Sequence, residues 1–292
     1  MPAPAPSRIA LVVHPTRTVD NALATLEGWA EDHSVPLVQL AVPGDGGRSL
    51  APQATLEGGD LVLALGGDGT ALSALRAAAS SDVPVLGVAC GSLGALSAVK
   101  AGDLAEGLDR VWSGDWTPRS LPALTVDDGE HREWAANDFV VVRKGAGQVV
   151  AELSIDDELY ARIAGDGLII ATPVGSSAYS MAAGGPILAV GTAAFVCTPL
   201  AMHGGSAPPL IVPADATATV LVQPGFAGFD VEIDGHERDL PGPCYSVTLH
   251  MDKLTLVAFT SSGYGFTGMR KRLLVLDSPR ILARDERAKH LS

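Results

Sequence analysis

The 292-residue chain carries a formal net charge of −13, and hydrophobic residues make up 47% of it. This acidic balance argues against a nucleic-acid partner, which requires clustered basic residues to neutralise phosphates. No stretch approaches the ~18 consecutive apolar residues of a membrane-spanning helix. The opening Met1-Pro2-Ala3-Pro4-Ala5-Pro6 lacks the basic and apolar regions of a secretion signal. We therefore expect a soluble, cytoplasmic protein with no membrane partner, and the length suits about two domains.

The cysteines are few and widely spaced. Cys90, Cys197 and Cys244 form no CxxC pair, and their number is odd. Neither a disulfide framework nor a zinc site is indicated by this spacing. We expect three buried free thiols in a reducing compartment.

Residues 1–118 alternate short apolar runs with segments of helical periodicity. The expected strands cover residues 8–13, 37–40, 61–65 and 85–88, and the expected helices cover roughly 18–32, 72–79 and 104–111. Strands that alternate with helices predict a parallel sheet covered on both faces, here a Rossmann-like α/β domain. The Gly-rich run from Pro43 to Gly47 is predicted to be an ordinary loop, because no clear helix follows it.

After Pro118 the pattern changes to short alternating runs separated by turn signals. This pattern predicts an antiparallel β-rich domain over residues 119–262. Within it, Asp156-Asp157-Glu158 is expected to be an acidic hairpin turn rather than a metal site. The remaining segment, 263–292, is expected to return to the N-terminal domain and to end in a frayed tail. Its basic run, Met269-Arg270-Lys271-Arg272, favours a solvated face over a contact with phosphates.

The third expected strand runs directly into Gly66-Gly67-Asp68-Gly69-Thr70, and a helix follows. The glycines let the backbone turn sharply and approach a ligand, and the unpaired N–H groups at the start of the helix favour phosphate. Asp68 could orient a hydroxyl, accept its proton or hold a metal that bridges phosphates. The structural alternative is a tight turn with a helix-capping aspartate.

The run from Gly66 to Thr70 resembles those of NAD kinases, diacylglycerol and sphingosine kinases, and phosphofructokinases. It therefore indicates phosphoryl transfer to a hydroxyl without naming the acceptor. The chain has neither a GxxxxGK[ST] phosphate loop nor the protein-kinase signatures, which excludes those two families.

A second candidate site lies at residues 166–186, where an apolar strand, Leu168 to Ala171, ends in Thr-Pro. A loop of small polar residues then leads to Ala178 and Tyr179. Small residues around one aromatic suit a close approach to a flat ring, and Asp166 could accept hydrogen bonds from an amide or from ribose hydroxyls. The alternative is a buried strand followed by a small-residue turn.

Residues 166–186 closely resemble the NAD kinase segment usually written ADGLIxATPTGSTAYSxSAGGP. Asn137-Asp138 is similar to that family's Asn-Glu pair, Gly87 to Gly94 to its GxNxGxLGF segment, and Asp234-Gly235 to its late Asp-Gly pair. The order of these motifs and the two-domain layout are also those of the family.

This resemblance implies transfer of a phosphoryl group from ATP or polyphosphate, with Mg²⁺ or another divalent metal, to the 2′-hydroxyl of the adenosine ribose of NAD. The product would be NADP, and Asp68 would orient or deprotonate that hydroxyl. The implied NAD contacts are Gly67, Asp68, Gly69, Asn137, Asp138, Asp166, Ser177, Ala178, Tyr179 and Asp234. The implied phosphate and ATP contacts are Gly66, Gly67, Gly69 and Thr70. No residue is assigned as a dedicated metal ligand, and a homodimer or homotetramer is implied.

Several positions depart from the family pattern. They are Ala89 for Asn, Ala95 for Phe, Asp138 for Glu, Val174 for Thr or Ser, and Pro208 for Arg. Asp138 keeps the charge with a shorter reach, and Val174 lacks a hydroxyl that could bind the base. These departures leave open the donor and the choice between NAD and NADH, and they motivate an alternative, a non-catalytic NAD(P)-binding sensor.

A lipid kinase is a further alternative, because it shares the Gly-Gly-Asp-Gly-Thr turn. Residues 166–186 and the lack of a basic amphipathic stretch for a membrane surface disfavour it. His203 is expected to be a packing or hydrogen-bonding residue.

Overall fold

The computed structural model describes residues 5–42, 47–223 and 228–259, together with 278 and 281. The predicted loop at 43–46 and the expectations for the C-terminal segment, including Arg270 to Arg272, lie outside the described residues. None of the helices in the described ranges has the length and apolar character needed to cross a membrane.

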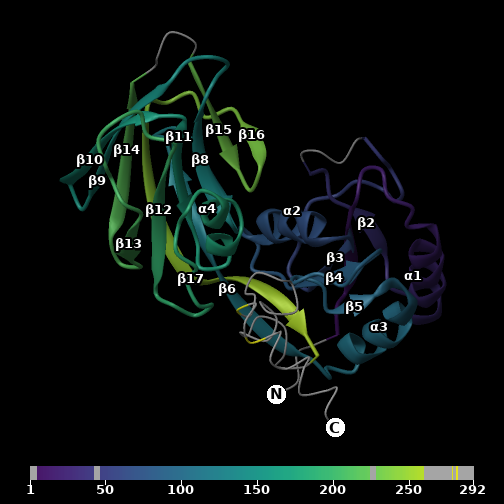
Figure 1. The fold of residues 1–292 in the computed structure, drawn as a ribbon. Coiled ribbons are helices and arrows are strands. Elements are labelled where there is room, and N and C mark those ends of the chain that lie inside the picture. The colour runs from purple at the N-terminus through teal and green to yellow at the C-terminus, as the bar shows by residue number, and fades with distance from the viewer. Residues whose placement is uncertain (1–4, 43–46, 224–227, 260–277, 279–280, 282–292) are drawn as a thin grey trace. The chain divides into compact units, whose positions relative to one another are not determined.

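The N-terminal part of the chain alternates strands and helices as predicted (Figure 1). Its elements are β1 (Arg8–Val13), α1 (Asp20–His33), β2 (Leu37–Gln39), β3 (Asp60–Gly66), α2 (Asp68–Ala78), β4 (Val85–Ala89), β5 (Val99–Lys100), the 3-10 turn η1 (Ala101–Asp103) and α3 (Leu104–Trp112). The strands pair in parallel in the order β4-β3-β1-β2, and β5 adds to β4. Every residue of β3 and β4 is buried, which explains their continuous apolar runs.

One apolar cluster packs α1 and α3 on this parallel sheet. It joins Leu26 of α1 and Leu108 of α3 to Leu63 of β3, and the indole Nε1 of Trp29 donates to Asp109 at 2.7 Å. The buried residues of α2 are outside this cluster, and α2 packs on β3 and β4. The helix that follows the Gly-rich turn therefore packs on β3, the strand that precedes the turn, and on β4.

The rest of the described chain is almost entirely β structure, as predicted. Antiparallel strands of the large sheet are β6 (Thr117–Asp127), β7 (Arg132–Ala135), β9 (Val149–Ile155), β10 (Glu158–Gly165), β14 (Thr217–Gln223) and β17 (Cys244–Ala258). The small sheet has the order β13-β12-β11-β8-β15-β16, with every pair antiparallel. Its strands are β8 (Asp138–Arg143), β11 (Gly167–Ala171), β12 (Ala194–Leu200), β13 (Leu210–Pro213), β15 (Phe229–Ile233) and β16 (His236–Arg238). The two short helical turns here are η2 (Gly175–Ser177) and α4 (Tyr179–Ala182).

The parallel strands and several antiparallel strands belong to one continuous large sheet. Strand β17 pairs antiparallel with β14 and β6, and near its end Leu256 pairs in parallel with Val85 of β4. The path through the sheet is therefore β10-β9-β14-β17-β4-β3-β1-β2. The chain returns to the parallel strands within β17, ahead of the segment that begins at residue 263.

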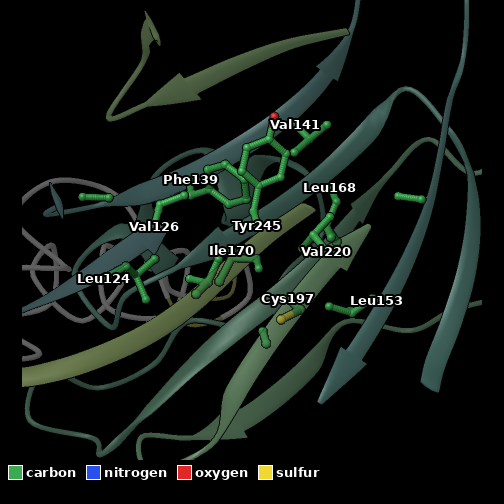
Figure 2. Packing of buried hydrophobic residues seen from close by; sticks show 14 of the residues in the cluster. Leu124, Val126, Phe139, Val141, Leu153, Leu168, Ile170, Cys197, Val220 and Tyr245 are labelled. Atoms are coloured by element: carbon green, nitrogen blue, oxygen red, sulfur yellow. The ribbon is translucent and has the colours of Figure 1, made fainter. Parts of the chain in front are cut away.

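The two sheets enclose the core of the β-rich part, to which alternate residues of most strands contribute (Figure 2). The rings of Phe139 from β8 and Tyr245 from β17 meet there, with their centroids 5.2 Å apart. All three cysteines are free, as expected, and Cys197 lies in this core. The expected burial holds for Cys197 alone. Cys90 is only partly buried, and Cys244 is exposed because it opens β17 on the outward-facing set of alternating residues.

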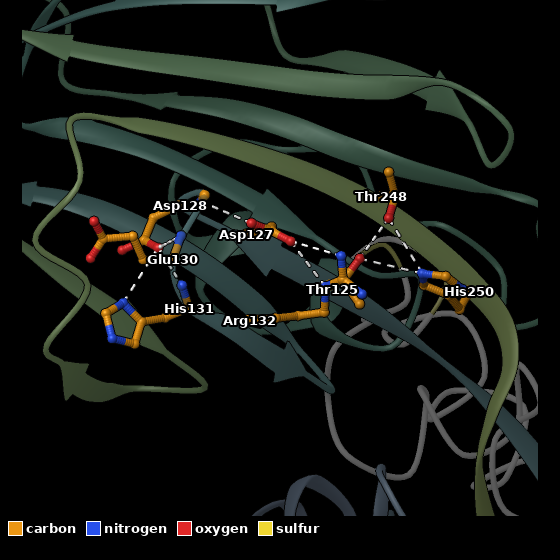
Figure 3. A network of polar contacts seen from close by, with 9 residues as sticks. Thr125, Asp127, Asp128, Glu130, His131, Arg132, Thr248 and His250 are labelled. Carbon is orange, nitrogen blue, oxygen red and sulfur yellow. Dashed lines mark hydrogen bonds and ion pairs between the residues drawn. The ribbon is translucent and has the colours of Figure 1, made fainter.

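Two acidic turns have structural explanations. Asp156 and Asp157 join β9 to β10 with φ of 48° and 66°, which confirms the predicted hairpin turn. In the turn between β6 and β7, Asp128 Oδ1 accepts the amide N–H of Glu130 and that of His131 at 3.0 and 2.7 Å (Figure 3). Backbone N–H groups bonded to Asp128, led by that of His131, lower the pKa of its carboxyl. Among the described residues, no group of three or more His, Cys, Asp or Glu could hold a metal ion.

Candidate functional site

The turn from Gly66 to Thr70 joins β3 to α2 at the carboxyl edge of the parallel strands. A Cβ at Gly66 would clash with the hydroxyl of Thr70, so the sharp turn requires glycine there. Gly67 is the N-cap residue in extended conformation, and no side chain caps the helix. The first N–H groups of α2 are therefore left for a ligand, and such groups favour phosphate.

Asp68 does not cap the helix, and its carboxylate is held from another segment. Oδ2 accepts the amide N–H of Ala95 at 2.9 Å, and Oδ1 accepts that of Leu96 at 3.0 Å. A Cβ at Gly94 would clash with Oδ1, so this approach requires glycine at position 94. The bonds fix the plane of the carboxylate, while each oxygen keeps a lone pair for a further donor. Because only the backbone of Ala95 is used, the replacement of Phe at this position leaves the contact intact.

A cavity of about 280 Å³ lies beside this turn. Its lining includes Gly67, Asp68, Gly69, Thr70 and Ser73 from the turn and α2, Val12 to Pro15, Arg17 and Val42 from the β1 side, and His236 from β16. The chain leaves β1 for β2 on one side and returns as β3 on the other. The cavity is thus at a topological switch point, which is where open α/β sheets bind ligands.

The residues predicted to contact NAD in the β-rich part also come together. Partial burial and the carboxylates of Glu232, Asp166 and Asp138 raise the pKa of the Tyr179 hydroxyl, so these three acids lie around it. Asp138 is almost completely buried, and burial together with Asp234 and Glu232 raises its pKa to about 7. Its carboxyl therefore exchanges its proton near neutral pH.

Asp166 lies beside basic residues that sequence analysis did not connect with it. Its Oδ1 accepts a hydrogen bond from Arg143 Nε at 2.6 Å, and His203 Nε2 is 3.9 Å from the same oxygen. His203 Nδ1 is also 3.2 Å from Gln148 Oε1, in agreement with the expected hydrogen-bonding role. The Asp166 carboxylate remains partly exposed and is available to a ligand hydroxyl or amide.

Asp234 is placed differently from the other predicted contacts. Its Oδ1 accepts the amide N–H groups of Asn137 and Asp138 at 2.7 and 3.2 Å, and its Oδ2 accepts that of Ala136 at 3.1 Å. The side chain is fully buried and also pairs with Arg76 of α2 at 3.4 Å. Asp234 therefore holds the segment that carries Asn137 and Asp138.

The loop after β11 packs closely on the same segment. A Cβ at Gly175 would clash with the carbonyl of Asn137, and the Thr172 hydroxyl donates to the carbonyl of Ala136 at 2.8 Å. Ser177 Oγ donates to the Val174 carbonyl at 3.1 Å, and the Val174 side chain is buried. Ala178 and Tyr179 at the start of α4 are exposed beside it.

Five residues near the predicted contacts were not predicted from the sequence: His14, Arg17, Arg143, Glu232 and His236. A signal existed for two of them. His236 directly follows the Asp234-Gly235 pair, and Arg17 follows the first strand at the edge where ligands bind. Burial and the cations Arg76 and Arg238 lower the pKa of His236, which favours the neutral imidazole in the cavity.

Two protein-family models match the chain. The model described as the ATP-NAD kinase N-terminal domain matches residues 10–116, and the ATP-NAD kinase C-terminal domain matches residues 136–243.

Curated relatives give the same family. An NAD kinase of Acidobacterium capsulatum is 34% identical over 282 residues, covering 91% of this chain and 98% of the relative. An NAD kinase of Koribacter versatilis is 33% identical over 78% of this chain and 84% of the relative. An NAD kinase of Porphyromonas gingivalis is 36% identical over 185 residues, and there the match spans 62% of this chain and only 64% of the relative's length.

Two solved structures share the fold. The yeast NADH kinase complexed with NADH superposes with a TM-score of 0.77 at 21% identity, covering 94% of this chain and 89% of that one. An NAD kinase from Archaeoglobus fulgidus in complex with ATP gives 0.71 at 22% identity, covering 92% and 100%. The expected fold, an α/β part followed by an antiparallel β-rich part, is thereby confirmed.

Proposed function

Because the chain belongs to the NAD kinase family, we propose that it phosphorylates the 2′-hydroxyl of the adenosine ribose of NAD to give NADP. The observation that carries this proposal is the carboxylate of Asp68. Asp68 is the first residue of α2, whose first N–H groups are uncapped. The N–H groups of Ala95 and Leu96 fix its carboxylate. A carboxylate beside a phosphate-binding helix terminus suits transfer of a phosphoryl group to a hydroxyl.

In this proposal Asp68 accepts a hydrogen bond from the ribose hydroxyl and orients or deprotonates it. The amides of Ala95 and Leu96 keep the carboxylate in one orientation before the substrate arrives. Such positioning carries most of the catalysis in phosphoryl transfer, because the loose transition state needs little covalent help.

NAD would bind to the residues of the β-rich part that gather around Tyr179. Asn137, Asp138 and Asp166 offer acceptors for ribose and adenine groups, and Ser177 and Ala178 directly precede Tyr179 in the chain. The tyrosine is 44% exposed, so its side chain is accessible to a base, on which an aromatic ring can stack. Asp234 accepts the amide N–H groups of residues 136–138 and so holds the segment that carries Asn137 and Asp138.

The donor phosphates would occupy the cavity at Gly66 to Thr70. We propose ATP or polyphosphate as the donor and Mg²⁺ as the ion that accompanies its phosphates. The residues fit an ion held mainly by phosphate, because Asp68 is the one carboxylate among the described residues that line the cavity, and Mg²⁺ commonly takes one or two carboxylates with its substrate. The ion would neutralise charge on the donor.

The test is NADP formation from NAD and Mg²⁺ with either ATP or polyphosphate, measured for the intact chain and for Asp68→Asn. We expect the variant to lose about 10²- to 10⁴-fold in turnover, the range for loss of a positioned acid–base group. The control is Asp115→Asn, an exposed partner of Arg110 outside the site, which should keep full activity. If NAD binds and neither donor yields NADP, the chain is a dinucleotide sensor and not a kinase.

We also propose a homodimer or homotetramer. Leu159 of β10 and Ile211 of β13 are large apolar residues that are 51% and 50% exposed. Exposed apolar side chains on strands at sheet edges suit contact with another copy. Light scattering coupled to size-exclusion chromatography would give the mass, and a monomer at micromolar concentration would contradict the proposal.

A further inference from the structure

Arg17 lies in the connection between β1 and α1, and its side chain reaches the carboxyl ends of two neighbouring strands. Its Nη1 is 3.4 Å from the position a Cβ would take on Gly67, at the end of β3. The same atom is 3.0 Å from the corresponding position on Gly91, which follows β4. The guanidinium therefore lies over the Gly-rich turn and lines the cavity beside Asp68.

The backbone of Arg17 is fixed, so the side chain starts from a defined point. His14 Nδ1 accepts the amide N–H groups of Thr16 and Arg17 at 3.2 and 3.1 Å. Arg48 Nη1 donates to the carbonyl of Arg17 at 2.7 Å. Because Nδ1 is an acceptor, the neutral His14 ring carries its proton on Nε2 as a further donor.

The guanidinium of Arg17 has no carboxylate partner within the part of the chain that the structure describes. Arg8, Arg76, Arg110, Arg132, Arg143 and Arg162 each pair with an acidic residue. The chain has 33 acidic residues against 20 basic ones, and the charge of Arg17 is left for a ligand of the cavity that it lines. Among the described residues, the cavity thus combines the Arg17 cation, uncapped helix N–H groups and two neutral histidines with a single carboxylate, that of Asp68.

This set of donors recognises linked phosphates. Guanidinium groups bind phosphate oxygens through two parallel N–H donors, and helix N-termini add backbone donors. Both substrates of the proposed reaction contain such phosphates. The residues assigned to NAD in the β-rich part, from Asn137 to Tyr179, do not line this cavity, which favours the donor as its occupant.

We propose that Arg17 binds the phosphates of the phosphoryl donor and helps to set the affinity for that donor. The proposal rests on the kinase function argued above. It assigns Arg17 to the donor and not to the diphosphate of NAD.

The first measurement is calorimetric binding of Mg·ATP and of tripolyphosphate, which requires no turnover. Arg17→Gln should weaken both by about tenfold to a hundredfold, the range for loss of a charge-assisted hydrogen bond. NAD affinity should stay within about twofold of the intact chain. Arg17→Lys keeps the charge without the planar fork and should recover part of the loss.

The second measurement is steady-state NADP formation, with each substrate varied in turn. Arg17→Gln should lower kcat/KM for ATP by a similar factor and leave the KM for NAD unchanged. Arg162→Gln is the matched control, because this exposed arginine of β10 is ion-paired and outside the cavity. Equal melting temperatures would establish that all three variants are folded.

Two results would overturn the assignment. One is unchanged binding of ATP and tripolyphosphate by Arg17→Gln, and the other is weakened NAD binding with donor binding intact. The binding measurements test the role of Arg17 independently of the kinase function. A chain that binds tripolyphosphate through Arg17 but forms no NADP would contradict the kinase function and retain the role of Arg17.

Discussion

Arg76 Nη1 lies 3.4 Å from Asp234 Oδ2, and the two side chains are 7% and 0% exposed. Arg76 is on α2, the helix that Asp68 opens, whereas Asp234 is in the turn between β15 and β16. Asp234 also accepts the amide N–H groups of residues 136–138. One buried ion pair thus connects the helix of the phosphate turn to the segment that carries Asn137 and Asp138.

Asp234→Asn tests this connection. The amide keeps one acceptor but places an NH₂ group against backbone N–H donors and removes the carboxylate that pairs with the buried Arg76. We expect the free energy of unfolding in urea to fall by about 2–4 kcal/mol. Asp230→Asn is the control, since this neighbour on β15 pairs with an exposed lysine and should cost at most ~1 kcal/mol. Equal losses of unfolding free energy for the two substitutions would show that the buried pair contributes no more to stability than the exposed pair.

Local features of the sequence predicted the elements well. Alternation and helical spacing depend on neighbouring residues, so β1 was predicted with its observed bounds, and the helix expected at 72–79 is α2, which begins earlier, at Asp68. The sharp turn at Gly66 was also predicted from its place between a strand and a helix, and a Cβ there would clash with Thr70.

Long-range relationships were not predictable in the same way. The continuous sheet depends on Leu256 meeting Val85, and neither periodicity nor turn signals report such a pairing. Arg17 looks like any surface arginine in the sequence, because its position over Gly67 and Gly91 depends on the order of the strands. The sequence also does not reveal that three backbone amides and Arg76 bind the carboxylate of Asp234.

Gly94→Ala should impair catalysis through Asp68. The added methyl would clash with Asp68 Oδ1 and displace the carboxylate from the amides of Ala95 and Leu96. A misplacement of this size costs about 100-fold in rate, to be measured as NADP formation at saturating substrates. Gly102→Ala has no atom within 4 Å of the new Cβ and should keep full activity. Wild-type turnover by Gly94→Ala would mean that the observed orientation of Asp68 is dispensable.

Asp157→Gly should stabilise the protein. Asp157 has a φ of 66° in the turn between β9 and β10, a conformation that glycine adopts without the steric cost of a Cβ. We expect a gain of about 0.5–1 kcal/mol in the free energy of unfolding. Glu158→Gly, one residue later at the start of β10, should instead lose a similar amount through backbone entropy. Effects of the same sign at both positions would contradict the turn conformation.

Asp138→Asn should change how stability depends on pH. Burial, Asp234 and Glu232 raise the pKa of Asp138 to about 7 in the folded chain, against ~3.9 when unfolded. The folded state therefore holds a proton that the unfolded state has lost, and the free energy of unfolding falls as pH rises from about 4 to about 7. Above that range the ionised, buried carboxylate costs roughly 2–4 kcal/mol.

Asparagine matches the shape of the protonated acid and carries no charge at any pH. Urea titrations should therefore find Asp138→Asn as stable as the intact chain below about pH 4, with an advantage that grows up to about pH 7 and persists near about pH 8. Asp127→Asn provides a contrast of opposite sign. Its carboxyl has a lowered pKa because it accepts the Gly129 amide N–H and pairs with Arg132, so removing that charge should lower stability at the higher pH. If Asp138→Asn is destabilised across the whole range, the ionised carboxylate has a favourable partner, and its proton is not held near neutral pH.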